Sequence, residues 1–375
     1  MECKKLGIAS VGIESNPMAA FASSVKVDWS ADPQMFESYA EEVASTALEK
    51  IEDIPTNAQI SLPLDGAYEN GERPLRQLEP EQMKLLLKDS ISPWPLHKTL
   101  VLLDEIDRHD APELRPYGRL ALANKLAYRI GNLKFGPEVG LGRIKYDSPV
   151  MHVWLDGMRE IASDINIVSD RADVAARVFK ADSRDMHQIM APNSIDAVIT
   201  SPPYPNEKDY TRTTRLESVI LGLIKDRQQL RSLKQDLIRS NTRGVYKSDT
   251  DDLVVEAHDG IQEIASTIER RRVELGKTSG FERLYPRVTR LYFGGMARHL
   301  ASLRPVLRPG AKLAYVVGDQ ASYLRVMIRT GQIVAELAES LGYRVIGVDL
   351  FRTRLSTVTG EQLREEVVLL EWKSS

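Results

Sequence analysis

The sequence is poor in cysteine and in the histidine patterns that hold metal ions. Its 375 residues include one cysteine, Cys3, which excludes an internal disulfide framework and a zinc site built from cysteines. A lone thiol also suits a reducing compartment. No metal-ligand spacing connects the six histidines, which are His97, His109, His152, His187, His258 and His299. We therefore expect no metal ion and no histidine-based nucleophilic catalysis.

Long hydrophobic runs and an excess of one charge are also missing. No apolar stretch reaches the roughly 18 residues that a membrane-spanning helix requires, and the first residues lead into no signal-peptide core. The formal net charge is −3, so any affinity for nucleic acid must come from a local basic patch. Hydrophobic residues make up 42% and charged residues 27% of the chain, as in ordinary globular proteins. The composition predicts a globular protein of the cytoplasm and nothing more specific.

Apolar segments rich in Val, Ile and aromatic residues predict six buried strands. They are residues 9–14, 177–181, 197–200, 312–317, 343–351 and 365–372. A helical pattern follows the first strand, with Pro17 at its start, and another precedes the fifth strand, with Gly342 at its end. Strands that alternate with helices indicate an α/β protein with a parallel sheet and helices on both faces. The last two strands, joined by residues 352–364, predict an antiparallel pair at one edge.

Two long polar stretches with helix-like patterns, residues 31–170 and 211–303, interrupt this alternation. We interpret them as insertions into a core formed by residues 1–30, 171–210 and 304–375. Such insertions can form a second lobe over the carboxyl ends of the strands, where ligands bind in open α/β sheets. The sequence contains no internal repeat and no low-complexity tract.

In the segment "SIDAVITSPPYPNEKDYTRTTRLE", residues 194–217, a strand runs into two prolines. Pro202 and Pro203 cannot donate to a sheet, so they end the strand and stiffen the turn. A rigid turn would hold the Ser201 hydroxyl and the Pro202 carbonyl as fixed acceptors beside the flat ring of Tyr204. Two acceptors and a stacking surface suit a planar ligand with an exocyclic NH₂ group, such as cytosine or adenine. The alternative is a plain strand-ending turn.

Such a turn could activate an aromatic amine, which is a poor nucleophile because its lone pair is delocalised into the ring. Hydrogen bonds from both N–H groups to Ser201 and Pro202 would favour a pyramidal nitrogen whose lone pair points at an electrophilic methyl group. Fixed dipoles then stabilise the transition state, and no strong general base is needed. The base must first leave its stack, and Tyr204 offers a replacement surface worth roughly 1–3 kcal/mol.

The string TSPPY resembles the catalytic motif of the DNA amino-methyltransferases, which methylate exocyclic amines using S-adenosyl-L-methionine. The resemblance implies a doubly wound, Rossmann-like methyltransferase sheet and a site-specific DNA methyltransferase of a bacterial modification or restriction-modification system. A first-position serine is more usual in cytosine-N4 enzymes, so cytosine N4 is the expected target and adenine N6 the alternative. "DYTRTTRLE", residues 209–217, resembles one subgroup, except that Lys208 replaces an aromatic residue. The catalytic residues implied are Ser201, Pro202, Pro203 and Tyr204.

Other segments match positions that bind the methyl donor in this family. "VGIESNP" ends a predicted strand at Glu14, where nucleotide-binding sheets place a carboxylate for ribose hydroxyls, and it resembles the family's Gly-Ile-Glu/Asp-x-Asn-Pro motif. "FKADSRD" places Asp182 at the position that accepts from the adenine amino group. "LRPGAKLAYVVGD" resembles a later motif that ends at Gly318 and Asp319. The cofactor-binding residues implied are Glu14, Asn16, Asp182 and Thr200. For a lone acidic residue, the alternative is a helix cap.

The family's glycine-rich turn, which resembles Asp-Pro-Phe-x-Gly-Ser-Gly and follows the first strand, has no counterpart in the sequence. "MECKKLG" looks like the last two turns of the helix after it, with Gly7 at the end. The glycines of "FGPEVGLG", residues 135–142, follow no convincing strand. We therefore expect a sheet without its middle strand, two edges that invite pairing with another chain, and weak binding of S-adenosyl-L-methionine by this chain alone. A misassigned start codon, a methyltransferase split across two polypeptides, or a decayed fragment would explain the gap.

Residues 225–247 form a basic segment that is a candidate DNA contact. Seven basic residues stand against two acidic ones, and several share one helical face. Phosphate binding would explain this face, and a solvated helix surface is the alternative. The predicted nucleic-acid-binding residues are Lys225, Arg227, Arg231, Lys234, Arg239, Arg243 and Lys247. "ERRR", residues 269–272, is a second candidate, and nothing identifies the side chains that would read the bases.

Two further classes of function stay open. Related Pro-Pro-Tyr turns serve the methylation of RNA and of glutamine side chains, and the two long insertions favour a large substrate without naming it. The non-enzymatic alternative is an inactive fragment, or a subunit that contributes the target-base pocket to a partner polypeptide.

Overall fold

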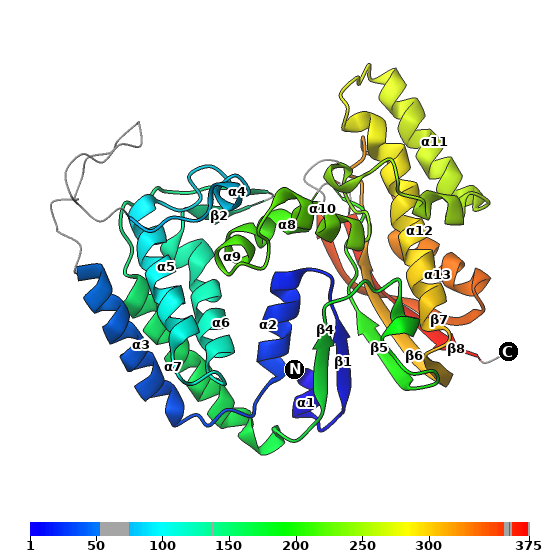
Figure 1. Ribbon diagram of the computed structural model, residues 1–375. Coiled ribbons are helices and arrows are strands. Elements are labelled where there is room, and N and C mark those ends of the chain that lie inside the picture. Colours follow the sequence, from blue (N-terminus) through cyan, green and yellow to red (C-terminus); the bar gives the residue numbers. More distant parts are fainter. Residues whose placement is uncertain (53–74, 137, 207, 356–359, 361, 374–375) are drawn as a thin grey trace. The chain divides into compact units, whose positions relative to one another are not determined.

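The computed structural model describes residues 1–52, 75–136, 138–206, 208–355, 360 and 362–373. These residues form a mixed α/β protein whose chain divides into two units. Unit 1 contains residues 1–180 and 211–232, and unit 2 contains residues 181–210 and 233–375. Figure 1 shows the elements of both units, coloured along the sequence.

Unit 1 begins with a helical turn and a small sheet. Helix α1 (Glu2–Lys5) ends where Gly7 takes a left-handed conformation (φ 74°), and backbone hydrogen bonds of the Schellman type close the turn. Strand β1 (Ser10–Ile13) then pairs in parallel with β4 (Ala176–Phe179). Every residue of these two strands is half-buried or exposed. The expectation that Gly7 ends a helix is confirmed, although the helix is one turn long rather than two.

Helices make up most of unit 1. The longer ones are α2 (Pro17–Val27), α3 (Met35–Glu52), α5 (Pro93–Arg108), α6 (Arg115–Lys125) and α7 (Val150–Val168). Trp154 of α7 is completely buried, and its indole N–H donates to the Gly118 carbonyl of α6 (2.8 Å). The shorter elements are α4 (Pro80–Met83), η2 (Leu126–Ile130), β2 (Leu133–Phe135), β3 (Val139–Leu141), η3 (Ser169–Arg171) and α9 (Arg215–Ile220). Helices α8 (Tyr210–Thr213) and α10 (Arg227–Asp236) each contain residues of both units.

A four-stranded sheet forms the centre of unit 2, in the order β5–β6–β8–β7. Its strands are β5 (Ile195–Thr200), β6 (Leu307–Gly318), β7 (Tyr343–Leu355) and β8 (Gln362–Trp372). Strand β5 runs parallel to β6, whereas β8 is antiparallel to both β6 and β7. The register places Gly318 of β6 opposite Glu365 of β8, and Glu365 opposite Arg352 of β7.

Three helices enclose the core of unit 2. Helices α12 (Tyr285–Leu303) and α13 (Thr330–Ser340) lie side by side along the sheet (Figure 1), and α11 (Asp259–Glu274) packs on α12. Phe293 of α12 and Leu313 of β6 are buried there. The remaining elements are η4 (Met186–Gln188), η5 (Thr242–Gly244), η6 (Asp251–Val255) and η7 (Glu282–Leu284).

The α/β class and all six predicted strands are confirmed, and the closing pair is antiparallel as expected. The predicted connection 352–364 is too long, because β7 and β8 stay paired to Leu355 and Gln362. Of this closing pair, β7 lies at the edge of the sheet and β8 is paired on both sides. Residues 31–170 also include the β2–β3 hairpin, which helical periodicity did not predict. The doubly wound sheet and the division into core and insertions stay predictions.

No helix among the described residues combines the length and the hydrophobicity needed to cross a membrane. Within the same residues, no group of three or more His, Cys, Asp or Glu side chains is arranged to hold a metal ion.

Candidate functional site

The Ser-Pro-Pro-Tyr turn leaves the carboxyl end of β5 beside the end of β6. Thr200, the last residue of β5, lies opposite Tyr315, and the prolines that follow have no N–H to continue the ladder. The Ser201 hydroxyl donates to the Val316 carbonyl of β6 (3.2 Å). Because this bond uses the hydroxyl hydrogen, the oxygen keeps lone pairs with which to accept from a ligand.

The Tyr204 ring lies against the backbone of Gly318, where β6 ends. A Cβ atom at position 318 would come within 2.8 Å of the ring, so a larger residue would displace it. Pro202, Pro203 and Tyr204 are half-buried, and Ser201 is exposed. The structure therefore brings all four predicted catalytic residues to one sheet end, with a fixed hydroxyl and a supported aromatic ring.

In unit 1, two predicted cofactor residues follow β1. The Asn16 side chain caps α2 by accepting from the Met18 N–H (3.0 Å), and its Nδ2 group donates to Thr214 Oγ1 (3.1 Å). The Glu14 carboxylate accepts from the Asn16 backbone N–H (2.8 Å). Burial raises the pKa of the Glu14 carboxyl, and bonds from backbone N–H groups oppose this. Both side chains thus form hydrogen bonds at the start of α2. A helix-capping role was the alternative interpretation of an acidic residue such as Glu14.

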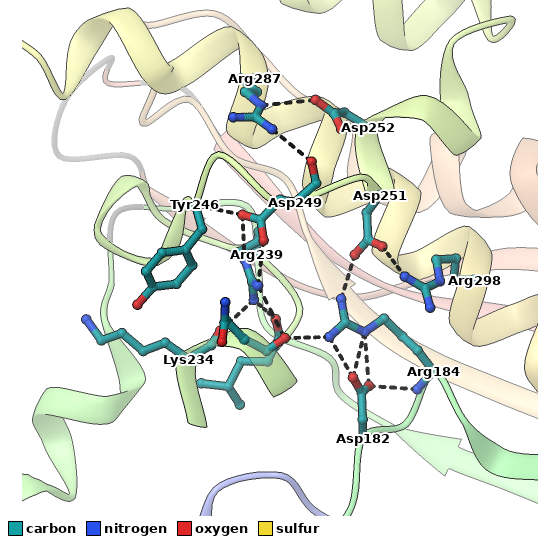
Figure 2. Close-up of polar contacts among 12 residues, drawn as sticks. Asp182, Arg184, Lys234, Arg239, Tyr246, Asp249, Asp251, Asp252, Arg287 and Arg298 are labelled. Atoms are coloured by element: carbon teal, nitrogen blue, oxygen red, sulfur yellow. Dashed lines mark hydrogen bonds and ion pairs between the residues drawn. The ribbon is translucent and has the colours of Figure 1, made fainter. Parts of the chain in front are cut away.

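In unit 2, Arg184 holds the predicted cofactor residue Asp182 (Figure 2). Its Nε lies 3.0 and 2.9 Å from the two carboxylate oxygens of Asp182, and its Nη2 lies 2.6 Å from Oδ2. Arg184 Nη1 donates to Asp251 (2.6 Å), which also accepts from Arg298 (2.7 Å). The Asp182 side chain keeps 17% of its surface exposed. The guanidinium therefore fixes the orientation of a carboxylate that can still be reached from outside.

His299 supports this region in a way that sequence reasoning missed. Its ring nitrogens hydrogen-bond with the Ser183 carbonyl (2.8 Å) and the Tyr315 hydroxyl (2.9 Å). Burial lowers the pKa of His299, which favours the neutral imidazole that can donate to one partner and accept from the other. Through these two hydrogen bonds, His299 connects the backbone just after Asp182 to β6, the strand that pairs with Thr200. No sequence signal identifies it, because its partners are far away in the chain.

Two of the predicted DNA-binding residues are paired inside unit 2. Lys234 forms an ion pair with Asp209 (2.8 Å). Arg239, whose side chain is 4% exposed, forms one with Asp249 (2.8 Å; Figure 2). The other five residues are exposed, and they are Lys225, Arg227 and Arg231 in unit 1 and Arg243 and Lys247 in unit 2. In the second candidate segment, Arg272 of α11 pairs with Glu269 (2.6 Å). Basic residues close together in sequence therefore have different environments.

Glu217 is the last residue of segment 209–217, which resembles one subgroup of the methyltransferases. It lines a cavity of about 890 Å³ in unit 1. The cavity wall is largely apolar and includes Trp29 and Ile165. Burial raises the pKa of the Glu217 carboxyl to about 7. Its Oε2 atom has no hydrogen-bond partner among the described residues. This acid is therefore partly protonated near neutral pH.

The chain is similar to Type II DNA methyltransferases over part of its length. It is 30% identical over 155 residues to the Type II methyltransferase M.AvaI of Nostoc sp. (strain PCC 7120), a match that covers 40% of this chain and 31% of that protein. M.AvaI of Anabaena variabilis matches to the same extent. M.BsoBI of Geobacillus stearothermophilus is 29% identical over 179 residues, or 43% of this chain and 34% of that protein. These similarities confirm the resemblance to DNA methyltransferases that the motifs predict.

The chain spans about a third of the length of these curated relatives, from 31% to 34%. No family model matches the sequence. No solved structure matches it either.

Proposed function

We propose that this chain carries the target-base site of an S-adenosyl-L-methionine-dependent DNA methyltransferase. It modifies an exocyclic amino group, with cytosine N4 as the target, in a bacterial modification or restriction-modification system in the cytoplasm. The supporting observation is the placement of Ser201 and Tyr204 at the end of β6, in a chain similar to Type II DNA methyltransferases. Adenine N6 is the alternative target, because both bases present the same amino group to the turn.

In this proposal the groups of the turn orient the amine. The Ser201 oxygen, whose hydrogen is directed at Val316, accepts one N–H, and the Pro202 carbonyl accepts the other. S-adenosyl-L-methionine, when bound, supplies a methyl group on a positively charged sulfur. The amine nitrogen, held by Ser201 and Pro202, would form the new N–C bond as the S–C bond breaks with its electrons left on sulfur, and its surplus proton would pass to solvent. The Tyr204 ring stacks on the extruded base.

The residues expected to bind the methyl donor fit its hydrogen-bonding groups. Glu14 would accept from ribose hydroxyls at the end of β1, as in other nucleotide-binding sheets. Asp182, oriented by Arg184 and partly exposed, would accept from the adenine amino group. Asn16 would contribute by capping α2, and Thr200 by ending β5 next to the turn.

We also propose that a further strand with a glycine-rich turn pairs with β5, supplied by a separate polypeptide or by a segment ahead of Met1. Within the described residues β5 pairs only with β6, and Ile199 on it is 80% exposed. Strand β1 likewise pairs only with β4 there, and Val11 is 42% exposed. Apolar strands of parallel sheets are normally covered on both faces.

With that strand in place, the proposed core would become a doubly wound, Rossmann-like sheet. Its parts are residues 1–30, 171–210 and 304–375. The proposed insertions are residues 31–170 and 211–303, of which the second would contact DNA through its exposed basic residues.

Methyl transfer to DNA tests the target-base site. The full chain, joined to a strand and glycine-rich turn ahead of Met1, would be incubated with DNA and labelled S-adenosyl-L-methionine, and the nucleosides identified by mass spectrometry. We expect N4-methylcytosine, whereas N6-methyladenine would support the alternative target. Ser201→Ala should lower the rate by about two orders of magnitude, as for the loss of one transition-state hydrogen bond. Tyr204→Ala should lower it as well.

Ser194→Ala is the matched control, because Ser194 precedes the same strand and its hydroxyl donates to the nearby Ala191 carbonyl (2.6 Å). Unchanged methylation by Ser201→Ala and Tyr204→Ala would refute the proposed site. Calorimetry tests the strand proposal separately, since we expect the chain alone to bind S-adenosyl-L-methionine weakly. Micromolar affinity of the isolated chain would contradict it, and no methylation after the addition would favour an inactive subunit.

A further inference from the structure

Four arginines gather at the end of the unit 2 sheet that carries Tyr204. Arg352 and Arg354 lie on β7, Arg364 on β8, and Arg329 immediately before α13. Their side chains are 40–66% exposed. We refer to these four residues as the arginine rim. None of them belongs to the basic segment 225–247 that the sequence singles out.

The strand register brings the rim close to the Ser-Pro-Pro-Tyr turn. Gly318, Glu365 and Arg352 lie opposite one another on three adjacent strands. Side chains at opposed positions project from the same face of a sheet, and the Tyr204 ring occupies the space where a side chain of Gly318 would lie. Arg352 therefore stands two strands away from the ring on that face, about 10 Å at the usual strand spacing.

Buried carboxylates form ion pairs with the arginines of the rim. Arg329 pairs with Asp319 (2.5 Å) and Arg352 with Glu365 (2.5 Å). Further pairs join Arg354 to Glu365 (3.4 Å) and Arg364 to Glu366 (3.0 Å). All three carboxylates are buried, whereas the side chains of the four arginines are 40–66% exposed. The accessible face of the cluster is therefore positive, although its total charge is nearly balanced.

Arginines held by buried carboxylates can bind phosphate groups better than freely solvated arginines. A guanidinium group has five N–H donors in a planar fork, so one edge can bind a carboxylate while another binds an oxyanion. The carboxylates limit the rotamers of these side chains, which reduces the entropy lost on binding. The pKa of Arg352 is raised, first by its hydrogen bond with Glu365 and in small part by Tyr204, so its charge persists at any physiological pH.

We infer that the arginine rim binds backbone phosphates of the DNA strand that carries the target base, next to the base stacked on Tyr204. The inference rests on the proposed function for the identity of the substrate. Phosphate contacts fix the register of a protein on DNA without reading its sequence. The rim would thus position the strand from which the base is extruded.

A charge-balanced pair of variants tests this inference. Arg352→Gln with Glu365→Gln removes one rim cation and its buried partner, so net charge is unchanged and no buried carboxylate loses its partner. The matched control is Arg344→Gln with Glu371→Gln, an ion pair between the same two strands. Arg344 lies eight residues before Arg352 on β7, which is about 25 Å at the usual rise per residue. Arg364→Gln with Glu366→Gln is a second rim variant, and circular dichroism checks that each variant folds.

DNA affinity of the full chain would be measured by fluorescence anisotropy over a range of salt concentrations. We expect each rim variant to weaken binding several-fold and to reduce the slope of log affinity against log salt by about 0.9, the value for one phosphate contact. The control should bind like the wild type. Wild-type affinity and slope in both folded rim variants, or an equal loss in the control, would overturn the inference.

Methylation by the lengthened chain separates this inference from the proposed function. A raised KM for DNA with unchanged kcat in the rim variants supports both. An unchanged KM in an active enzyme refutes the rim alone. Weakened DNA binding by the rim variants, with no methylation by any form of the chain, refutes the proposed function but still supports phosphate binding by the rim.

Discussion

The two parallel strand pairs of this protein differ in how far their own unit buries them. In unit 2, β5 joins a sheet whose inner strands are well covered, and Leu313 of β6 and Val368 of β8 are almost completely buried. In unit 1, every residue of β1 and β4 is half-buried or exposed. Burial of apolar surface drives folding, and a two-stranded sheet is marginal by itself. The Ser-Pro-Pro-Tyr turn therefore follows a strand of a well-covered sheet, whereas Glu14 and Asn16 follow a strand pair that its own unit covers only in part.

A large loss of stability should come from overpacking the contact between α12 and η6 in unit 2. A Cβ atom at Gly294 of α12 would lie 1.8 Å from the Asp251 carbonyl oxygen. Gly294→Ala should therefore lower the free energy of unfolding by about 3 kcal/mol, because overpacking outweighs the gain in helix propensity. Urea denaturation measures this loss.

Gly347→Ala on β7 is the control, because the nearest atom to its added Cβ is a side-chain oxygen at an ordinary 3.4 Å. It should change the free energy of unfolding much less. A stability of Gly294→Ala equal to that of the wild type would mean that η6 does not pack tightly on α12.

In unit 1, stability should depend on pH through Glu217. Its pKa is raised from 4.5 to about 7 by burial, so the folded state holds a proton that the unfolded state releases between these values. The contribution of Glu217 is therefore most favourable below pH 4.5 and is lost as pH rises through about 7, by an amount on the order of 3 kcal/mol. Denaturation at pH 5 and pH 8 measures the difference.

Glu217→Gln removes this titration and keeps the size of the side chain. It should be more stable than the wild type at pH 8 and similar to it at acidic pH. If the two proteins show the same pH dependence, Glu217 is not buried in the way that the structure describes.

The smallest effect should be seen at the uncovered strand. Ile199→Ala in β5 should change the free energy of unfolding by less than about 0.5 kcal/mol, because the side chain is 80% exposed. Leu313→Ala in β6 is the buried counterpart and should cost about 2–5 kcal/mol. The comparison becomes sharper after a strand is added ahead of Met1, because the cost of Ile199→Ala should then rise. A constant small cost would speak against pairing at this edge.

Local patterns predicted much of the fold. Apolar runs located every strand of the two parallel pairs, and Pro17, Gly7 and Gly342 marked helix ends, because capping depends on residues adjacent in the chain. The β2–β3 hairpin was missed, since its strands are three residues long and carry little periodicity. The limits of β7 were misjudged because polar residues such as Arg352 can sit on an exposed edge strand.

The roles assigned to the candidate site residues stay predictions, but the structure shows the environment of each of them. The Ser-Pro-Pro-Tyr turn was identified because a strand followed by two prolines is a local signal. Lys234 and Arg239 were assigned to a DNA surface because of their charge, but the structure pairs both with aspartates. The charge of a side chain is local information, whereas its partner is set by tertiary packing.

The sequence alone determined where most of the strands lie, where several helices begin or end, and that two prolines end β5 in a stiff turn, since these features depend on neighbouring residues. Tertiary structure alone decided which charged residues are buried in ion pairs and which stay exposed. Arg352 illustrates the difference, because it lies beside the Tyr204 turn only through hydrogen bonding across three strands. Strand register joins residues distant in the chain, and no local pattern encodes it.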